Sequence, residues 1–179
     1  MARKKIHEII EIPEGVQVEI VGNKVKMKKG SEEVGKRVSY SVKQEDKKLV
    51  LSNENPTKRD KRLIKTTLAH LKNMVEGLGE KYIYKLQICS VHFPINVEVK
   101  EDNVIVKNFL GEVKERRAKI LSGVQVKVEG EFVTVESSDK EKAGQTAANI
   151  ETTTKIRKKD RRIFQDGIFI VEKQKGRKR

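Results

Sequence analysis

The chain of 179 residues carries 40 Lys and Arg against 26 Asp and Glu, a formal net charge of +14, and only 36% of it is hydrophobic. This length allows one ordinary domain or two small ones, and no apolar run approaches the ~18–20 residues of a membrane-spanning helix. The single cysteine excludes an internal disulfide and agrees with a reducing, cytoplasmic environment. The positive charge indicates a polyanionic partner, either nucleic acid or an anionic membrane surface.

An internal repeat organises the sequence. The segments 12–25 and 93–105 match at an offset of about 80 residues, with Pro13 and Pro94 in equivalent places. Each shows apolar–polar alternation, a turn of residues that tolerate positive φ and a second alternating run, which predicts a β-hairpin. In each copy a second pair of strand-like runs follows.

Each copy then shows a helical pattern. In the first copy, apolar residues recur at helical spacing over 63–78, after a predicted cap at Asn55 and Pro56. In the second copy, the spacing of Ser138 and Glu141 predicts a capping box. We therefore predict an α+β fold of two tandem similar domains, each an antiparallel β-sheet of four or five strands packed on one face by a single α-helix.

The predicted boundary between the copies lies at 79–80. The second copy carries two cationic stretches that we interpret as insertions, 111–119 between its hairpins and 155–162 after its helix. We therefore expect the second copy to bind the polyanion. The predicted domains are residues 1–80 for packing and protein contacts, 81–172 for binding the polyanion, and a basic tail at 173–179.

Over half of the net charge lies near the C-terminus. Residues 155–179 hold eleven basic and three acidic side chains, and six of the eight residues in 155–162 are basic. A second basic run, 173–179, lies at the same end of the chain. Two basic runs so close together favour a polyanion-binding surface over a merely solvated one. A further cluster at 58–62, which we expect to precede a helix, is interpreted as solvated surface.

Catalytic motifs are absent from the sequence. It contains no glycine-rich phosphate loop, nucleophile elbow or zinc-ligand spacing, so no cofactor, metal or enzymatic activity is expected. One alternative is a metal-dependent ribonuclease that uses Asp160 or Asp166, although the surrounding Lys and Arg favour charge pairing for these carboxylates. Another is an anionic-membrane binder, which lacks an amphipathic helix near the basic run. Phe169 is predicted to be a strand core residue and the role of Phe164 is left open, so folded RNA is favoured over single strands.

The run 161–170, RRIFQDGIFI, resembles the C-terminal signature of the archaeal and eukaryotic branch of the L-six family of large-subunit ribosomal proteins, and the blocks 108–112 and 144–150 support this resemblance. It implies a non-enzymatic component of the cytoplasmic ribosome. Its second domain, residues 81–172 here, would bind large-subunit ribosomal RNA near the sarcin–ricin loop, among neighbouring ribosomal proteins and close to the docking site of translation GTPases. The sequence departs from the expected Gln at Thr152 and the expected Tyr at Phe169, and its overall pattern favours the archaeal type.

The candidate RNA contacts are basic residues of the second copy and residues of the matching signature blocks. They are Lys107, Asn108, Gly111, Lys114, Arg116, Arg117, Lys155, Arg157, Lys158, Lys159, Arg161, Arg162, Phe164, Gln165, Asp166, Gly167, Lys173, Lys175, Arg177, Lys178 and Arg179.

Overall fold

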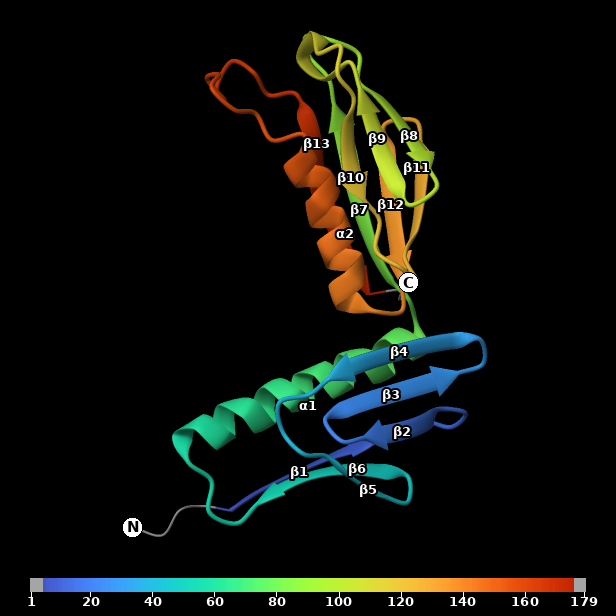
Figure 1. The fold of residues 1–179 in the computed structure, drawn as a ribbon, viewed down its shortest axis with the longest axis vertical. Helices are drawn as coiled ribbons and strands as arrows, with labels where there is room; N and C mark the ends of the chain where they lie inside the picture. Colours follow the sequence, from blue (N-terminus) through green and yellow to red (C-terminus); the bar gives the residue numbers. More distant parts are fainter. Residues whose placement is uncertain (1–4, 176–179) are drawn as a thin grey trace. The chain divides into compact units, whose positions relative to one another are not determined.

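The structure is a computed structural model that describes residues 5–175. The chain divides into two compact units, residues 1–79 and residues 80–179, each of which builds its own hydrophobic core. Both units combine one long helix with antiparallel strands, which confirms the predicted α+β class (Figure 1).

The N-terminal unit contains two three-stranded sheets and one helix. The sheet orders are β1-β6-β5 and β2-β3-β4, and every pairing is antiparallel. The elements are β1 (Ile6–Glu11), β2 (Gln17–Val21), β3 (Lys24–Lys29), β4 (Glu32–Arg37), β5 (Lys43–Glu45), β6 (Lys48–Asn53) and α1 (Lys58–Gly79).

The C-terminal unit contains a three-stranded sheet, β10-β9-β8, and a four-stranded sheet, β11-β12-β7-β13. Its helix α2 packs against strands of both sheets. The elements are β7 (Tyr82–Cys89), β8 (Asn96–Lys100), β9 (Asn103–Lys107), the 3₁₀ turn η1 (Phe109–Gly111), β10 (Arg116–Lys119), β11 (Gln125–Glu129), β12 (Phe132–Ser137), α2 (Lys140–Thr153) and β13 (Gly167–Lys175).

The two units repeat one order of elements, with one strand, two hairpin strands, a third strand, two more strands and a helix. Two details differ from the sequence-based prediction. Each unit has two small sheets rather than one sheet of four or five strands. The stretch 111–119 is only partly an insertion, because Arg116–Lys119 forms β10, the counterpart of β4. The added part is the connection from η1 to β10, and β13 is an additional strand in the C-terminal unit.

Both helices begin later than predicted. At α1 the cap is a reciprocal pair, in which the Thr57 hydroxyl accepts from the Asp60 backbone N–H while the Asp60 carboxylate accepts from Thr57. At α2 the N-cap is Asp139. Its carboxylate accepts from the backbone N–H groups of Glu141 at 2.9 Å and Lys142 at 3.4 Å. The predicted caps at Asn55 and Ser138 are therefore wrong by one or two residues, and the cluster 58–62 forms the first turns of α1 rather than preceding it.

Alternating apolar residues on the strands and one stripe on each helix fill the cores. In the N-terminal unit, Val25 and Met27 of β3 meet Ile64 and Leu71 of α1. In the C-terminal unit, residues of β7, β9, β12 and β13 form one buried cluster with Ile150 of α2. The core of the C-terminal unit holds the connection between α2 and β13, drawn in orange-red, which extends past the C-terminal end of α2 (Figure 1).

Candidate nucleic-acid interface

The connection between α2 and β13, residues 155–166, holds the densest cationic run and is called the basic loop below. Its two ends are tied together, because the buried hydroxyl of Thr154 accepts a hydrogen bond of 2.9 Å from the backbone N–H of Ile168. The same Thr154 caps α2, and its backbone N–H donates to the last turn of the helix. The loop therefore leaves and re-enters the scaffold at one fixed point.

Asp166 anchors the C-terminal end of the basic loop to the end of β7. Its side chain is 1% exposed, and one carboxylate oxygen accepts from the backbone N–H groups of Val91 at 2.7 Å and His92 at 2.9 Å. The other oxygen lies 2.6 Å from Nδ1 of the His92 ring. Burial by itself would raise the pKa of Asp166, but these hydrogen bonds outweigh it and hold the pKa at about 2.

Aromatic and cationic groups stack beside this anchor. The Phe164 ring lies 4.9 Å from the His92 ring, centroid to centroid, and the Lys159 ammonium lies 4.6 Å from the centroid of the Phe164 ring. A cation at this distance is attracted to the face of the ring. Phe164 therefore contributes to the packing of the loop.

Asp160 organises the turn in the middle of the basic loop. Its backbone carbonyl accepts from the N–H groups of Ile163 and Phe164, and its carboxylate accepts from the backbone and the guanidinium of Arg162. Hydrogen bonds from the Arg162 side chain, and then from its backbone, lower the pKa of Asp160. The Arg162 side chain is nevertheless 91% exposed, so it remains open to an external anion.

Several cations on the basic loop point into solvent without an internal partner. Arg157, Lys158 and Arg161 are exposed and form no ion pair or hydrogen bond through their side chains within residues 5–175. Lys158 has a left-handed backbone with φ of 60°, which marks the sharp bend that turns the chain here. The acidic residues of the loop are thus engaged internally while these cations are not.

A groove continues this cationic surface between β10 and α2. It is open to solvent, has a volume of about 640 Å³, and is called the basic groove below. Arg117 and Lys119 reach it from the exposed face of β10, and Lys155 and Arg157 reach it from the start of the basic loop. Arg117 also lies 3.7 Å from Glu115 but keeps 70% of its side chain exposed.

Arg116, a predicted RNA contact, is engaged by internal partners. Its guanidinium forms a two-point ion pair with Glu112, donates to the Thr153 carbonyl at 2.8 Å and lies 4.3 Å from the centroid of the Phe109 ring. The hydrogen bond from Arg116 lowers the pKa of Glu112. Arg116 thus joins β10, the η1 connection and the C-terminal end of α2, where unsatisfied carbonyls attract cations.

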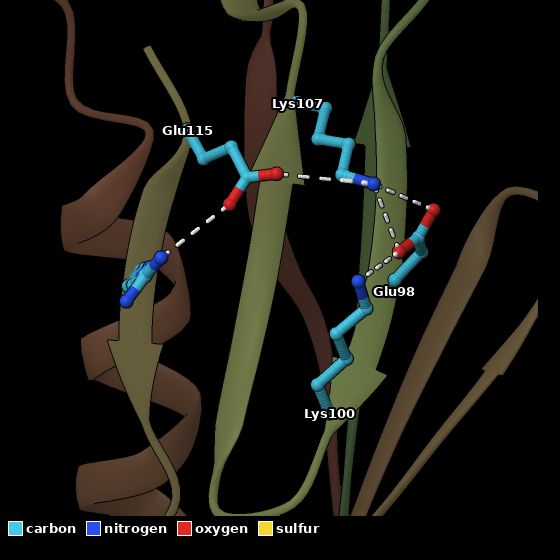
Figure 2. A network of polar contacts seen from close by, with 5 residues as sticks. Glu98, Lys100, Lys107 and Glu115 are labelled. Atoms are coloured by element: carbon cyan, nitrogen blue, oxygen red, sulfur yellow. Dashed lines mark hydrogen bonds and ion pairs between the residues drawn. The ribbon is translucent and has the colours of Figure 1, made fainter.

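Lys107 is also paired internally. Figure 2 shows its ammonium between Glu98 and Glu115, and its distances to the Glu98 oxygens are 3.0 and 3.1 Å. Lys100 joins the same network, and hydrogen bonding by Lys107 lowers the pKa of Glu98. A phosphate would have to displace a carboxylate to reach Lys107.

The remaining residues of the predicted 107–117 region occupy the connection before β10. Asn108 has a left-handed backbone, and its side-chain amide donates to the Pro94 carbonyl at 3.0 Å. Gly111, with φ of 76°, sits against the Phe93 ring. Lys114 is exposed and has no partner in the described part of the chain, so its charge is available to an external anion.

The end of the basic loop combines buried and exposed residues. Asp166 and Gly167, both predicted RNA contacts, are buried, while Gln165 is exposed. One prediction is wrong here. Phe169 is 39% exposed rather than a core residue, because strand alternation points it away from the face on which Ile168 is fully buried. Together with Phe164 and Arg161, Phe169 lines a hollow of about 870 Å³.

The predicted basic tail begins inside the fold. Lys173 and Lys175 belong to β13, which pairs with β7 along its whole length apart from one register shift. Lys173 is exposed. Arg177, Lys178 and Arg179 lie outside the described residues.

The sequence analysis missed two residues of this region, one in the basic groove and one in the Asp166 anchor. Lys119 shares the exposed face of β10 with Arg117, and strand alternation would have indicated this once β10 was recognised. His92 lies 74 residues from Asp166 in sequence, and no local pattern links the two.

The carboxylates proposed for a ribonuclease are occupied by other partners. Asp160 binds Arg162, and Asp166 binds backbone N–H groups and His92. Residues 5–175 contain no group of three or more His, Cys, Asp or Glu arranged to hold a metal ion. Neither helix in this range is long and apolar enough to cross a membrane.

Comparison with known proteins identifies the family. The family described as Ribosomal protein L6 matches residues 93–167, which include the groove and the basic loop. Large ribosomal subunit protein uL6 of Methanococcus vannielii is 45% identical over 171 residues, covering 94% of each chain. The uL6 protein of Ignicoccus hospitalis is 43% identical over 177 residues, covering 94% of this chain and 95% of the relative. The chain therefore belongs to the uL6 family of large ribosomal subunit proteins.

Proposed function

We propose that the C-terminal unit binds large-subunit ribosomal RNA through the basic loop and the basic groove. Membership of the uL6 family makes the protein a structural component of the large subunit of the cytoplasmic ribosome, rather than an enzyme such as a ribonuclease. The observation that carries the proposal is the set of outward cations without internal partners, Arg157, Lys158 and Arg161, on a loop whose ends are fixed.

The distribution of charge supports this assignment. Residues 80–154 hold 11 basic and 12 acidic side chains, whereas residues 155–179 hold 11 and three. The body of the unit is thus close to neutral, and the excess divides between the basic loop, with six basic and two acidic residues, and residues 167–179, with five and one. The basic loop by itself therefore concentrates a net charge of +4. Such a concentration attracts a polyanion and releases the counterions condensed on it.

The chemistry of the surface suits folded RNA. Arginine guanidinium groups can fork onto two phosphate oxygens, and a lysine ammonium adds a point charge. The wide minor groove of A-form RNA presents phosphates and 2′-hydroxyls that a preorganised cationic edge can follow. Phe164 is half-buried and packed against His92, so Phe169, which is 39% exposed, is the one aromatic ring beside the basic loop with substantial free surface among the described residues. A platform for single-stranded bases usually needs several such rings.

The resemblance noted above supports a more specific position. We propose that the RNA contacted lies close to the sarcin–ricin loop, which places the C-terminal unit near the docking site of translation GTPases and among other large-subunit proteins. Protection of that loop from hydroxyl radicals by the full-length protein is the expected result. Protection elsewhere in large-subunit RNA, with the loop still fully cleaved, would contradict this placement but leave RNA binding itself intact.

A matched pair of variants tests the interface. Arg161→Gln removes one outward cation of the basic loop, and Lys127→Gln removes one exposed cation from β11. The slope of log K against log salt for binding large-subunit ribosomal RNA should become shallower by about 0.7–0.9 for Arg161→Gln. It should stay at the wild-type value for Lys127→Gln. Equal slopes for both variants and the wild type would refute the proposed interface.

A further inference from the structure

A second cationic surface lies on the N-terminal unit, along the outer face of α1. Lys58, Arg62, Lys65 and Lys72 are all exposed and are separated by four, three and seven residues, which places them on one face of the helix. The buried residues of α1, such as Ile64 and Leu71, lie on the opposite face. At 1.5 Å per residue this α1 stripe is roughly 20 Å long.

The α1 stripe lacks acidic partners in the structure. None of its four side chains forms an ion pair or a hydrogen bond within residues 5–175. On β3 of the same unit, by contrast, Lys26 and Lys28 share the carboxylate of Glu33 at 3.3 and 3.1 Å. The unit thus pairs the two central cations of this strand, whereas the four cations of the α1 stripe form a longer, regularly spaced row without partners.

The N-terminal part of the α1 stripe lies where the helix dipole disfavours positive charge. Five basic residues occupy the first eight positions of α1, its last turn has none, and Asp60 is the only acid in the first turn. The N-terminal end of a helix is its positive pole, so cations there are disfavoured. The like-charged pairs Lys58–Arg62 and Lys61–Lys65, four residues apart, repel each other. An external anion relieves both effects.

We propose that the α1 stripe binds the phosphate backbone of ribosomal RNA, as a second RNA contact separate from the basic loop. Among the described residues, none of the exposed large apolar side chains lies on α1. A protein interface usually has an apolar or aromatic centre and few lysines. Regularly spaced cations without such a centre match a line of phosphates instead. The proposal gives the 58–62 cluster a role beyond solvation and adds RNA contact to the protein contacts expected of domain 1–80.

Salt dependence of binding tests the stripe in the full-length protein. The variant Lys58→Gln/Arg62→Gln/Lys65→Gln removes three charges from α1, and Gln keeps a helix propensity close to that of Lys and Arg. The matched control Lys29→Gln/Lys43→Gln/Lys48→Gln removes three exposed, unpaired charges from the strands of the same unit. The slope of log K against log salt for large-subunit ribosomal RNA should become shallower by about 2–3 for the α1 variant.

The comparison separates this inference from the proposed function. If Arg161→Gln changes the slope and the α1 variant does not, the stripe makes no RNA contact, binds something else such as an acidic protein, and the inference is wrong. If the control triple changes the slope as much as the α1 triple, general charge is responsible and the inference is equally wrong. A change with the α1 triple but not with Arg161→Gln would support the stripe and contradict the basic loop.

A positional measurement complements the affinities. Ala69 is exposed on the same face of α1, so Ala69→Cys in a Cys89→Ser background can carry a tethered iron chelate. In reconstituted large subunits the chelate should cleave ribosomal RNA close to α1. A chelate at Lys43→Cys on β5 provides the comparison. Cleavage from both positions at the same intensity, or from neither, would overturn the proposal.

Discussion

The anchor formed by Asp166 leads to a prediction about stability. Asp166→Asn keeps the size of the side chain but removes its charge and one acceptor oxygen. That carboxylate accepts from the backbone N–H groups of Val91 and His92 and lies against the His92 ring. With an amide in its place, one of these donors faces an NH₂ group instead of an oxygen. We expect the substitution to destabilise the end of β7 and the basic loop together.

The magnitude follows from the pKa. The ordinary pKa of this carboxyl is 3.8 and its pKa in the folded protein is about 2. A depressed folded-state pKa stabilises the fold by about 2 kcal/mol above pH 4, and this contribution is lost as the pH falls from about 4 through 2. Asp166→Asn should therefore lower the free energy of unfolding by about 2 kcal/mol at pH 7. It should also flatten the acid dependence of that free energy between pH 4 and pH 2.

Urea unfolding at pH 7 and pH 3, combined with exchange rates of the Val91 and His92 amide protons, measures both effects in the full-length protein. Asp102→Asn is the control, because Asp102 is an exposed carboxylate in the β8–β9 turn and its side chain has no partner among the described residues. The control should lie within about 0.5 kcal/mol of the wild type. If Asp166→Asn unfolds like the wild type at pH 7 and keeps its full acid dependence, the anchor does not work as described.

Two further substitutions test other parts of the scaffold, and both can be measured as urea midpoints at constant m-value. Arg116→Gln leaves Glu112 and the Thr153 carbonyl without their charged donor, and should lower the free energy of unfolding by about 1.5–3 kcal/mol. Arg116→Lys should recover only part of the loss because it cannot fork, so full recovery would contradict the two-point pairing. Thr67→Val replaces a buried hydroxyl that has no hydrogen-bond partner within residues 5–175 and should raise the free energy of unfolding by about 1 kcal/mol. A loss of stability would show that this hydroxyl is satisfied.

The periodicity and the internal repeat of the sequence were sufficient to predict the α+β class of the fold. The apolar spacing over 63–78 reports the buried face of α1 directly, because a helix on a sheet buries one stripe. The cap positions were not predicted correctly. Thr57 lies two residues after the predicted Asn55, and Asp139 lies one residue after the predicted Ser138. Several neighbouring polar residues satisfy the same local rules.

The internal partners of the charged residues could not be predicted in the same way. In the sequence, an arginine whose charge is free, such as Arg157, cannot be told from one whose charge is paired internally, such as Arg116. The pairing of Asp166 with His92 depends on two elements 74 residues apart that meet only after the chain has folded. A list of basic residues therefore overestimates an RNA interface, and the geometry of the fold decides which charges remain available.

The two units reach the same net charge by different routes. Unit 1 holds 18 basic and 11 acidic residues and unit 2 holds 22 and 15, so each has a net charge of +7. In unit 1 the helix carries six basic and two acidic residues, whereas its counterpart α2 carries two of each and the charge lies in the loop that follows. Both helices bury their opposite face in the core. Because a solvent-facing side chain contributes little to that core, its charge could diverge after duplication without loss of the fold, which is how one scaffold can offer two separate cationic surfaces.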